Sequence, residues 1–203
     1  MKVEIKRVSS PYEYALPNGR TLFRVDEAVL SHERFDGTMS PDLTRVNFER
    51  GDGVGVLLYA SDSNEVVLVE QFRYPVYASL PEGAPGPRGW LVEIVAGIKD
   101  AEGHVVAQRE LLEETGYELS DPLERLTTVY ASPGGSSERI ELYLARVKQA
   151  LGIRDRAGLP SESEDIRPVV IPLPVALEMA QDGRIQDAKT LIALLMLRDR
   201  LKR

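Results

Sequence analysis

The sequence predicts an α+β protein, in which a layered α/β/α domain with a mixed β-sheet follows a small lobe made mostly of β-strands. Runs rich in β-branched and alternating apolar residues recur along the chain, and turn-forming residues separate several of them. Only a few segments show the periodicity and capping residues of helices. We place the lobe at residues 1–50 and the main domain at residues 51–203.

The first hairpin is predicted in the N-terminal lobe. Asn18-Gly19 stands between the β-rich runs 12–16 and 21–25, and both residues of the pair tolerate positive φ. The main domain then opens with a second predicted hairpin, GVGVLLYA–SDSN–EVVLVEQFRY, which covers residues 53–74.

The remaining elements are predicted in chain order. PEGAPGPRG at 81–89 is a loop, and the following strand, 90–95, is expected to place Trp90 in the core. Two further strands are predicted at 123–131 and 138–147. An irregular polar stretch follows at 151–167, and two helices are predicted at 174–181 and 187–201. The last helix has Asp187 as its predicted N-cap.

Composition excludes several classes of protein. The 203 residues include no cysteine, which excludes disulfides, zinc thiolate sites and a cysteine nucleophile. The first ten residues lack the apolar region of a signal peptide, and the longest apolar run, 191–197, is too short to cross a bilayer, so we expect a cytoplasmic protein with no membrane partner. The net charge of −7 argues against nucleic acid as a partner, and it means that a phosphate-containing substrate would need a metal cation.

A cluster of glutamates lies on the helix predicted at 104–115, which Gly116 ends. Glu110, Glu113 and Glu114 stand at positions i, i+3 and i+4, so they share one face of this helix. Like charges at this spacing cost about 0.2–0.5 kcal/mol per pair, and the negative end of the helix dipole lies close by. Two interpretations follow: a solvated acidic face, or a site for a hard divalent cation that prefers carboxylate oxygens.

The run RELLEETGY, residues 109–117, resembles the second half of the Nudix box at every defined position. The first half differs, because Gly97 stands two residues closer to Arg109 than the usual spacing and Glu102 is the nearest counterpart of the early glutamate. The resemblance extends from about residue 44 to residue 197 and is to the ADP-ribose pyrophosphatase and GDP-mannose hydrolase branch. Its other segments are TR…FERG at 44–51, VEQFR at 69–73, EIVAG at 93–97, SPGG…ER at 132–139, ESEDI at 162–166 and GRIQDAKT at 183–190.

The resemblance implies a Nudix fold and a set of site residues. The metal ligands would be the Ala96 carbonyl, Glu110 and Glu114, with Glu113 close by or acting through a coordinated water. Arg109 would pair with the glutamates and orient them.

The composition of the loop GLPSESEDIR, residues 158–167, is that of a flexible acidic connector. The resemblance implies instead a mobile loop that carries catalytic residues. The resemblance implies that Glu162 is the catalytic base and Glu164 a further metal ligand, and the opposite assignment stays open. A loop can close on bound substrate and exclude other water.

Four residues outside the box are candidates for substrate binding. The guanidinium of Arg73 suits phosphate oxygens, and Arg45 is expected to reach the site of a second subunit. Ser132 and Glu138 flank the SPGG turn and would contact the sugar or nucleotide. The alternatives are surface charges at strand ends and a simple β-turn.

The predicted function is Mg²⁺-dependent hydrolysis of the diphosphate of a nucleoside diphosphate sugar, with Mn²⁺ as a substitute cation. ADP-ribose, giving AMP and ribose 5-phosphate, is the leading substrate, and GDP-mannose is the alternative. A Nudix-fold sensor that binds nucleotides without cleaving them is the rival from another class. Relatives of this branch imply a homodimer in which the N-terminal lobe crosses to the partner.

Overall fold

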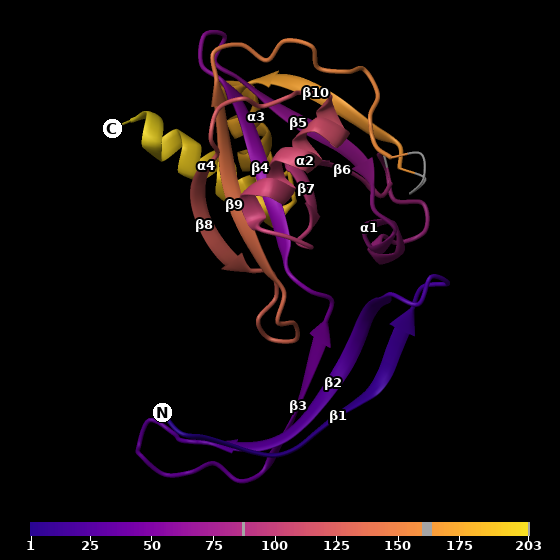
Figure 1. Ribbon diagram of the computed structural model, residues 1–203, viewed down its shortest axis with the longest axis vertical. Coiled ribbons are helices and arrows are strands. Elements are labelled where there is room, and N and C mark those ends of the chain that lie inside the picture. The colour runs from indigo at the N-terminus through magenta and orange to yellow at the C-terminus, as the bar shows by residue number, and fades with distance from the viewer. Residues whose placement is uncertain (87, 160–163, 203) are drawn as a thin grey trace. The chain divides into compact units, whose positions relative to one another are not determined.

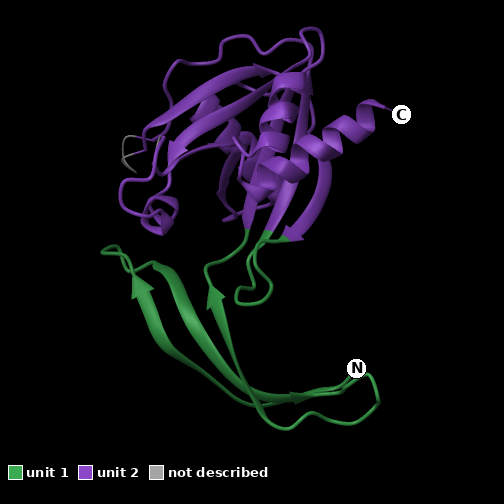
Figure 2. Cartoon of the chain, turned by 180° about the vertical axis from the view of Figure 1, so that it is seen from behind, with its two compact units in different colours: residues 1–52, 130–139 green, residues 53–129, 140–203 purple. Residues whose placement is uncertain are grey.

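The computed structural model describes residues 1–86, 88–159 and 164–202. The chain divides into two units (Figure 2): unit 1 comprises residues 1–52 and 130–139, and unit 2 comprises residues 53–129 and 140–203. Unit 1 therefore contains a second, short segment from the middle of the chain, in addition to the predicted N-terminal lobe.

Unit 1 is a three-stranded antiparallel sheet in the order β1-β2-β3, formed by Val3–Ala15, Thr21–His32 and Leu43–Glu49. The predicted first hairpin joins β1 to β2, and Gly19 supplies the positive φ of its turn at 82°. The segment 130–139 attaches to β3, because the Phe48 amide donates to the Gly135 carbonyl at 2.8 Å and Ser136 Oγ donates to the Phe48 carbonyl at 2.9 Å. The predicted SPGG turn is thus hydrogen-bonded to the N-terminal sheet.

Unit 2 is built on a mixed sheet of seven strands (Figure 1). The main order is β10-β5-β4-β9-β8, while β6 pairs with β5 and β7 pairs with β4. The strands are β4 Gly53–Ala60, β5 Glu65–Phe72, β6 Trp90–Glu93, β7 Val95–Ile98, β8 Glu124–Tyr130, β9 Arg139–Val147 and β10 Ile166–Pro172. The pairing of β4 with β9 is parallel, whereas β5, β7 and β10 pair antiparallel with their neighbours.

Helices cover both faces of this sheet. α2 (Gly103–Thr115) packs on one face, and α3 (Leu173–Asp182) and α4 (Ala188–Leu201) pack on the other. Along β4, Val56 belongs to the core under α2 and Leu57 to the core under α3 and α4, because successive strand residues point to opposite faces. Both faces are buried, which explains why GVGVLLYA is almost continuously apolar. The predicted α/β/α sandwich is confirmed, and each fully buried leucine contributes about 1.5–3 kcal/mol to it.

The structure corrects three local predictions. The strand predicted at 90–95 is broken into β6 and β7 at Ile94, whose amide donates to the side chain of Thr190 at 2.7 Å instead of to a strand. The stretch 151–167 was predicted to be irregular, yet β10 begins at Ile166 and occupies a sheet edge, where its prolines cost no ladder hydrogen bond. Trp90 is 38% exposed and so lies outside the core, and the short helix α1 (Tyr74–Ser79) was not predicted.

The helix predictions were more accurate. Asp187 caps α4 by accepting from the Thr190 amide, and Gly116 ends α2 in the left-handed conformation, with φ of 76°. Within the described residues, no helix is both long enough and apolar enough to span a membrane.

Candidate functional site

The candidate site lies where α2 crosses β7. Gly97 is in β7, and a Cβ at this position would fall inside the volume occupied by the carboxyl group of Glu110 on α2. Any larger side chain at position 97 would force the carboxyl group of Glu110 to move from this place. The glycine of the predicted motif has this steric reason, since it lets a glutamate lie against the strand.

Glu114 is the most deeply buried acid of the cluster, with 4% of its surface exposed. Its Oε2 accepts from the amide of Ala96 in β7 at 3.4 Å. The pKa of Glu114 is raised to about 8, first by burial and then by the nearby charges of Glu110 and Glu164, while the Ala96 amide and Arg73 act in the opposite direction. A buried carboxyl group of this kind is a functional-site candidate, because the metal-free fold does not offset its charge.

The pKa of Glu110 is also raised above its ordinary value. Burial raises its pKa, and the charges of Glu113 and Glu164 act in the same direction. Arg109 opposes this by donating from Nη2 to Glu110 Oε1 at 3.3 Å, while the same nitrogen donates to Asp100 at 3.0 Å. Arg109 is therefore shared between the cluster and the loop before α2.

The loop that contains Glu164 approaches the C-terminal end of α2. The Gly158 amide donates to the Glu113 carbonyl at 3.3 Å, and Glu164 Oε2 accepts from the Leu159 amide at 3.1 Å. Together with its effect on the pKa of Glu110, this places Glu164 beside the glutamates of α2. Glu162, the predicted base, lies outside the described residues.

Arg73 also lies near this cluster. Its guanidinium donates to both oxygens of Glu93 in β6, at 2.8 and 3.3 Å, and its charge opposes the rise in the pKa of Glu114. Lys189 at the start of α4 forms a second ion pair with Glu93. Sequence reasoning assigned no role to Glu93 or Lys189, although both stand in segments that carried the family resemblance, EIVAG and GRIQDAKT.

The other three candidate residues lie in unit 1. Arg45 is exposed on β3 and donates to the carbonyl of Thr44 at 3.0 Å. Glu138 Oε1 lies 3.7 Å from Arg50 Nε, and the carbonyl of Ser132 accepts from two amides of the turn that follows it. The structure therefore brings together Arg73, Ala96, Arg109, Glu110, Glu113, Glu114 and Glu164 in unit 2, and it holds Arg45, Ser132 and Glu138 in unit 1.

The residues in unit 2 fit a divalent cation. Their donors are carboxylate oxygens, which hard cations prefer, and the buried acids have raised pKa values that a nearby positive ion would lower. Across the described parts of the chain, no three His, Asp or Glu side chains already stand together as a complete set of ligands. A cation at this site would have to draw the carboxylates closer together.

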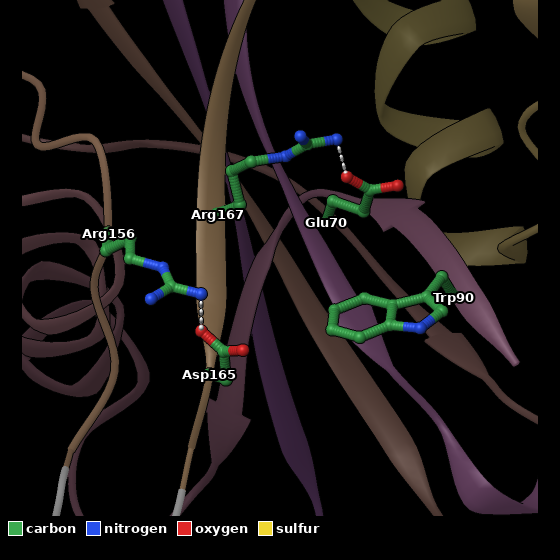
Figure 3. Close-up of a pocket in the computed structure, with 5 residues that line it drawn as sticks. All are labelled: Glu70, Trp90, Arg156, Asp165 and Arg167. Atoms are coloured by element: carbon green, nitrogen blue, oxygen red, sulfur yellow. Dashed lines mark hydrogen bonds and ion pairs between the residues drawn. The ribbon is translucent and has the colours of Figure 1, made fainter. Parts of the chain in front are cut away.

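A cavity of about 310 Å³ is bordered by β5, β6, β10 and the loop before β10 (Figure 3). It is lined by Glu70, Trp90, Arg156, Asp165 and Arg167, of which Glu70 pairs with Arg167 and Asp165 with Arg156. Glu70 follows Val69, which packs under α2, so strand alternation directs Glu70 to the opposite face of the sheet. A second cavity, of about 340 Å³, lies in unit 1 and is lined by Glu49, Gly51, Asp52, Tyr130, Ser137 and Arg139. Neither cavity contains a predicted site residue.

Comparison with known proteins identifies the family to which this fold and its carboxylate-bearing helix belong. The family model of the NUDIX domain matches residues 49–194. The chain belongs to the Nudix family and is a Nudix hydrolase, as its box predicted.

Individual relatives agree with this assignment. The chain is 35% identical over 173 residues to a GDP-mannose pyrophosphatase of Pectobacterium atrosepticum, covering 85% of each chain. It is 36% identical over 160 residues to a GDP-mannose pyrophosphatase of Yersinia enterocolitica, covering 78% of this chain and 80% of the relative. A crystal structure of an ADP compounds hydrolase superposes with a TM-score of 0.70 at 20% identity, over 100% of this chain and 95% of the other, which shows that the fold is shared.

Proposed function

We propose that this Nudix hydrolase cleaves the diphosphate bond of a nucleoside diphosphate sugar, using a divalent cation, Mg²⁺ or Mn²⁺, held against α2. The observation that carries the proposal is the buried carboxyl group of Glu114, which contacts the backbone of β7 and whose pKa is raised to about 8. Such a group is destabilising in the metal-free fold, and a bound cation removes that cost.

The proposed ligands are Glu110, Glu114 and Glu164, with Glu113 and the Ala96 carbonyl beside them. When bound, the cation supplies Lewis-acid polarisation of the phosphoryl oxygens and lowers the pKa of water. Arg109 orients Glu110 through the bond at 3.3 Å.

Two residues are proposed to act on the substrate itself. Arg73 binds a phosphate oxygen with the N–H groups that Glu93 leaves free. Glu162 takes the proton of the attacking water, and Glu164 is the alternative base, because it stands in the same loop and lies beside the glutamates of α2.

The names of the relatives favour GDP-mannose as the substrate, which would yield GMP and mannose 1-phosphate. ADP-ribose, which would yield AMP and ribose 5-phosphate, is the second candidate, because the loop GLPSESEDIR resembles that of ADP-ribose-hydrolysing relatives. The phosphate released from a panel of nucleotide sugars after phosphatase treatment, with and without Mg²⁺, will rank the two.

The matched variants for this assay are Glu114→Gln and Glu118→Gln. Glu114→Gln is expected to lower kcat/KM by at least about 100-fold, which corresponds to about 2.7 kcal/mol of transition-state stabilisation. Glu118 is exposed just beyond α2 and serves as the control, with expected activity close to that of the unmodified chain. Full Mg²⁺-dependent turnover by Glu114→Gln would contradict the proposed ligand set, and saturable binding without turnover by the unmodified chain would favour a sensor.

We also propose that unit 1 is a dimerisation element. Val3, Ile5 and Val8 of β1 are all more than half exposed, so the sheet presents apolar side chains that a second copy of the chain could cover. Arg45 on β3 would then serve the partner's site. Sedimentation or light scattering should give a dimer mass, and Ile5→Lys should shift it toward the monomer.

A further inference from the structure

A largely buried ion-pair cluster connects the start of α4 to the residue that follows β5. Its members alternate in charge, in the order Arg73, Glu93, Lys189 and Asp187. Neighbouring members of the cluster are close enough to form hydrogen bonds: Arg73 with Glu93, Glu93 with Lys189, and Lys189 with Asp187. Glu93 and Lys189 are 96 positions apart in the chain. The cluster contains equal numbers of positive and negative groups, so it is neutral before any substrate arrives.

The members differ in their access to solvent. The side chain of Glu93 is 3% exposed and that of Lys189 is 11% exposed, whereas that of Arg73 is 37% exposed. Arg73 is therefore the member of the cluster best placed to meet a ligand. Its charge also acts on Glu114, which places the guanidinium on the side of the carboxylate cluster.

Glu93 holds the guanidinium in a defined orientation. Glu93 Oε1 accepts from Arg73 Nε at 2.8 Å and Oε2 accepts from Nη2 at 3.3 Å, a two-pronged contact that fixes the plane of the guanidinium. Lys189 donates to Oε2, so the rotation of the carboxylate is fixed from a second side. The remaining N–H groups of Arg73 stay available for phosphate oxygens.

Lys189 also has an electrostatic role. When Arg73 turns its charge toward an anionic ligand, Glu93 would be left buried with a weakened partner, which is costly for a carboxylate. Lys189 keeps Glu93 in an ion pair both before and after Arg73 contacts the ligand. Lys189 is itself held by Asp187 at 2.9 Å, and Asp187 is fixed as the N-cap of α4 by the amide and hydroxyl of Thr190 at 2.9 and 2.5 Å.

We infer that Lys189, acting through the buried carboxylate of Glu93, is a positioning residue that presents Arg73 to the diphosphate of the substrate; this inference rests on the proposed function of the site. The anchor comes from the α3/α4 layer, on the opposite face of the sheet from α2. The layer that carries no predicted ligand thus contributes to substrate binding.

The test is a binding cycle with α,β-methylene-ADP, a diphosphate that resists hydrolysis, measured by titration calorimetry in the presence of Mg²⁺. Lys189→Met is expected to raise Kd by at least about fivefold, a smaller effect than the removal of a charged group that contacts the ligand directly. Lys189→Arg keeps the positive charge beside Glu93, so its Kd should rise less than that of Lys189→Met. Lys99→Met is the control, because Lys99 also forms an ion pair with a glutamate, Glu141 at 2.6 Å, that does not belong to the cluster of Arg73, Glu93, Lys189 and Asp187.

The decisive comparison is made in a Glu93→Gln background. If Lys189 acts through Glu93, adding Lys189→Met to Glu93→Gln should change Kd by less than about twofold, since coupled residues are not additive. This background avoids a buried unpaired carboxylate, so the variants are expected to fold. An equal loss of affinity with and without Glu93→Gln, no loss with Lys189→Met, or no saturable binding by the unmodified chain would each overturn the inference.

Turnover of GDP-mannose and ADP-ribose by the unmodified chain is measured separately. Binding that follows the expected cycle without any turnover would count against the proposed hydrolysis and in favour of the positioning role. Turnover by the unmodified chain, without the expected differences in Kd among the Lys189 and Glu93 variants, would support the proposed hydrolysis and count against the positioning role of Lys189.

Discussion

The burial of Glu114 leads to a prediction about stability in the absence of metal. Its pKa in the folded protein is raised from 4.5 to about 8, so between these pH values the folded chain binds more protons than the unfolded chain. The free energy of unfolding must therefore fall as pH rises through this interval. The stabilising contribution of the protonated group is complete below pH 4.5 and is lost by about pH 8.

The size of this effect follows from the same interval. At about 1.4 kcal/mol per pH unit, the cost of ionising Glu114 in the folded chain reaches about 3 kcal/mol at pH 7 and about 5 kcal/mol at full ionisation. Glutamine resembles the protonated acid in shape and carries no charge. Glu114→Gln should therefore have nearly the stability of the unmodified chain at pH 5 and exceed it by several kcal/mol at pH 8.

Urea unfolding in EDTA at several pH values between 5 and 8.5 measures this difference. Glu118→Gln is the control, because an exposed glutamate should give a small difference that does not vary with pH. A Glu114→Gln curve that runs parallel to that of the unmodified chain would refute the reasoning. Millimolar Mg²⁺ should stabilise the unmodified chain more at pH 8 than at pH 6, because the cation requires the ionised carboxylate.

Two further changes test the framework around the site. Gly97→Ala places a methyl group where Glu110 lies, so kcat/KM should fall by at least about 100-fold while the melting temperature changes far less than for a core variant; unchanged turnover would show that Glu110 can move without consequence. Thr190→Val removes the hydroxyl that accepts from the buried Ile94 amide at 2.7 Å, so urea unfolding should show a loss of about 1–3 kcal/mol, and a smaller loss would show that another group satisfies this amide.

Local signals predicted most of the fold. The SDSN turn gave the hairpin of β4 and β5, and Asp187 and Gly116 correctly marked helix ends, because caps and turns depend on residues only a few positions apart. The predictions that failed depend on distant neighbours. β10 is a strand because it pairs with β5, and β6 ends at Glu93 because the amide of the next residue, Ile94, donates to Thr190 instead of to a strand.

In the candidate site, too, local spacing predicted some features, whereas others depend on residues distant in the chain. The spacing of Glu110, Glu113 and Glu114 already placed three carboxylates on one helical face, and the box identified the family. No pattern in the chain indicated which of the three is buried. The structure singles out Glu114, because it lies against the Ala96 amide 18 positions earlier in the chain.

The sequence by itself determined the chemistry available to this protein: acidic ligands at helical spacing, glycines where backbone must turn or come close, and arginines suited to phosphate. Only the tertiary structure decided how strongly these groups act. Burial raises the pKa of Glu114, and Lys189 reaches Glu93 from another layer of the fold. The physical reason is that desolvation and ion pairing depend on distance in space, and folding alone brings residues 96 positions apart into contact.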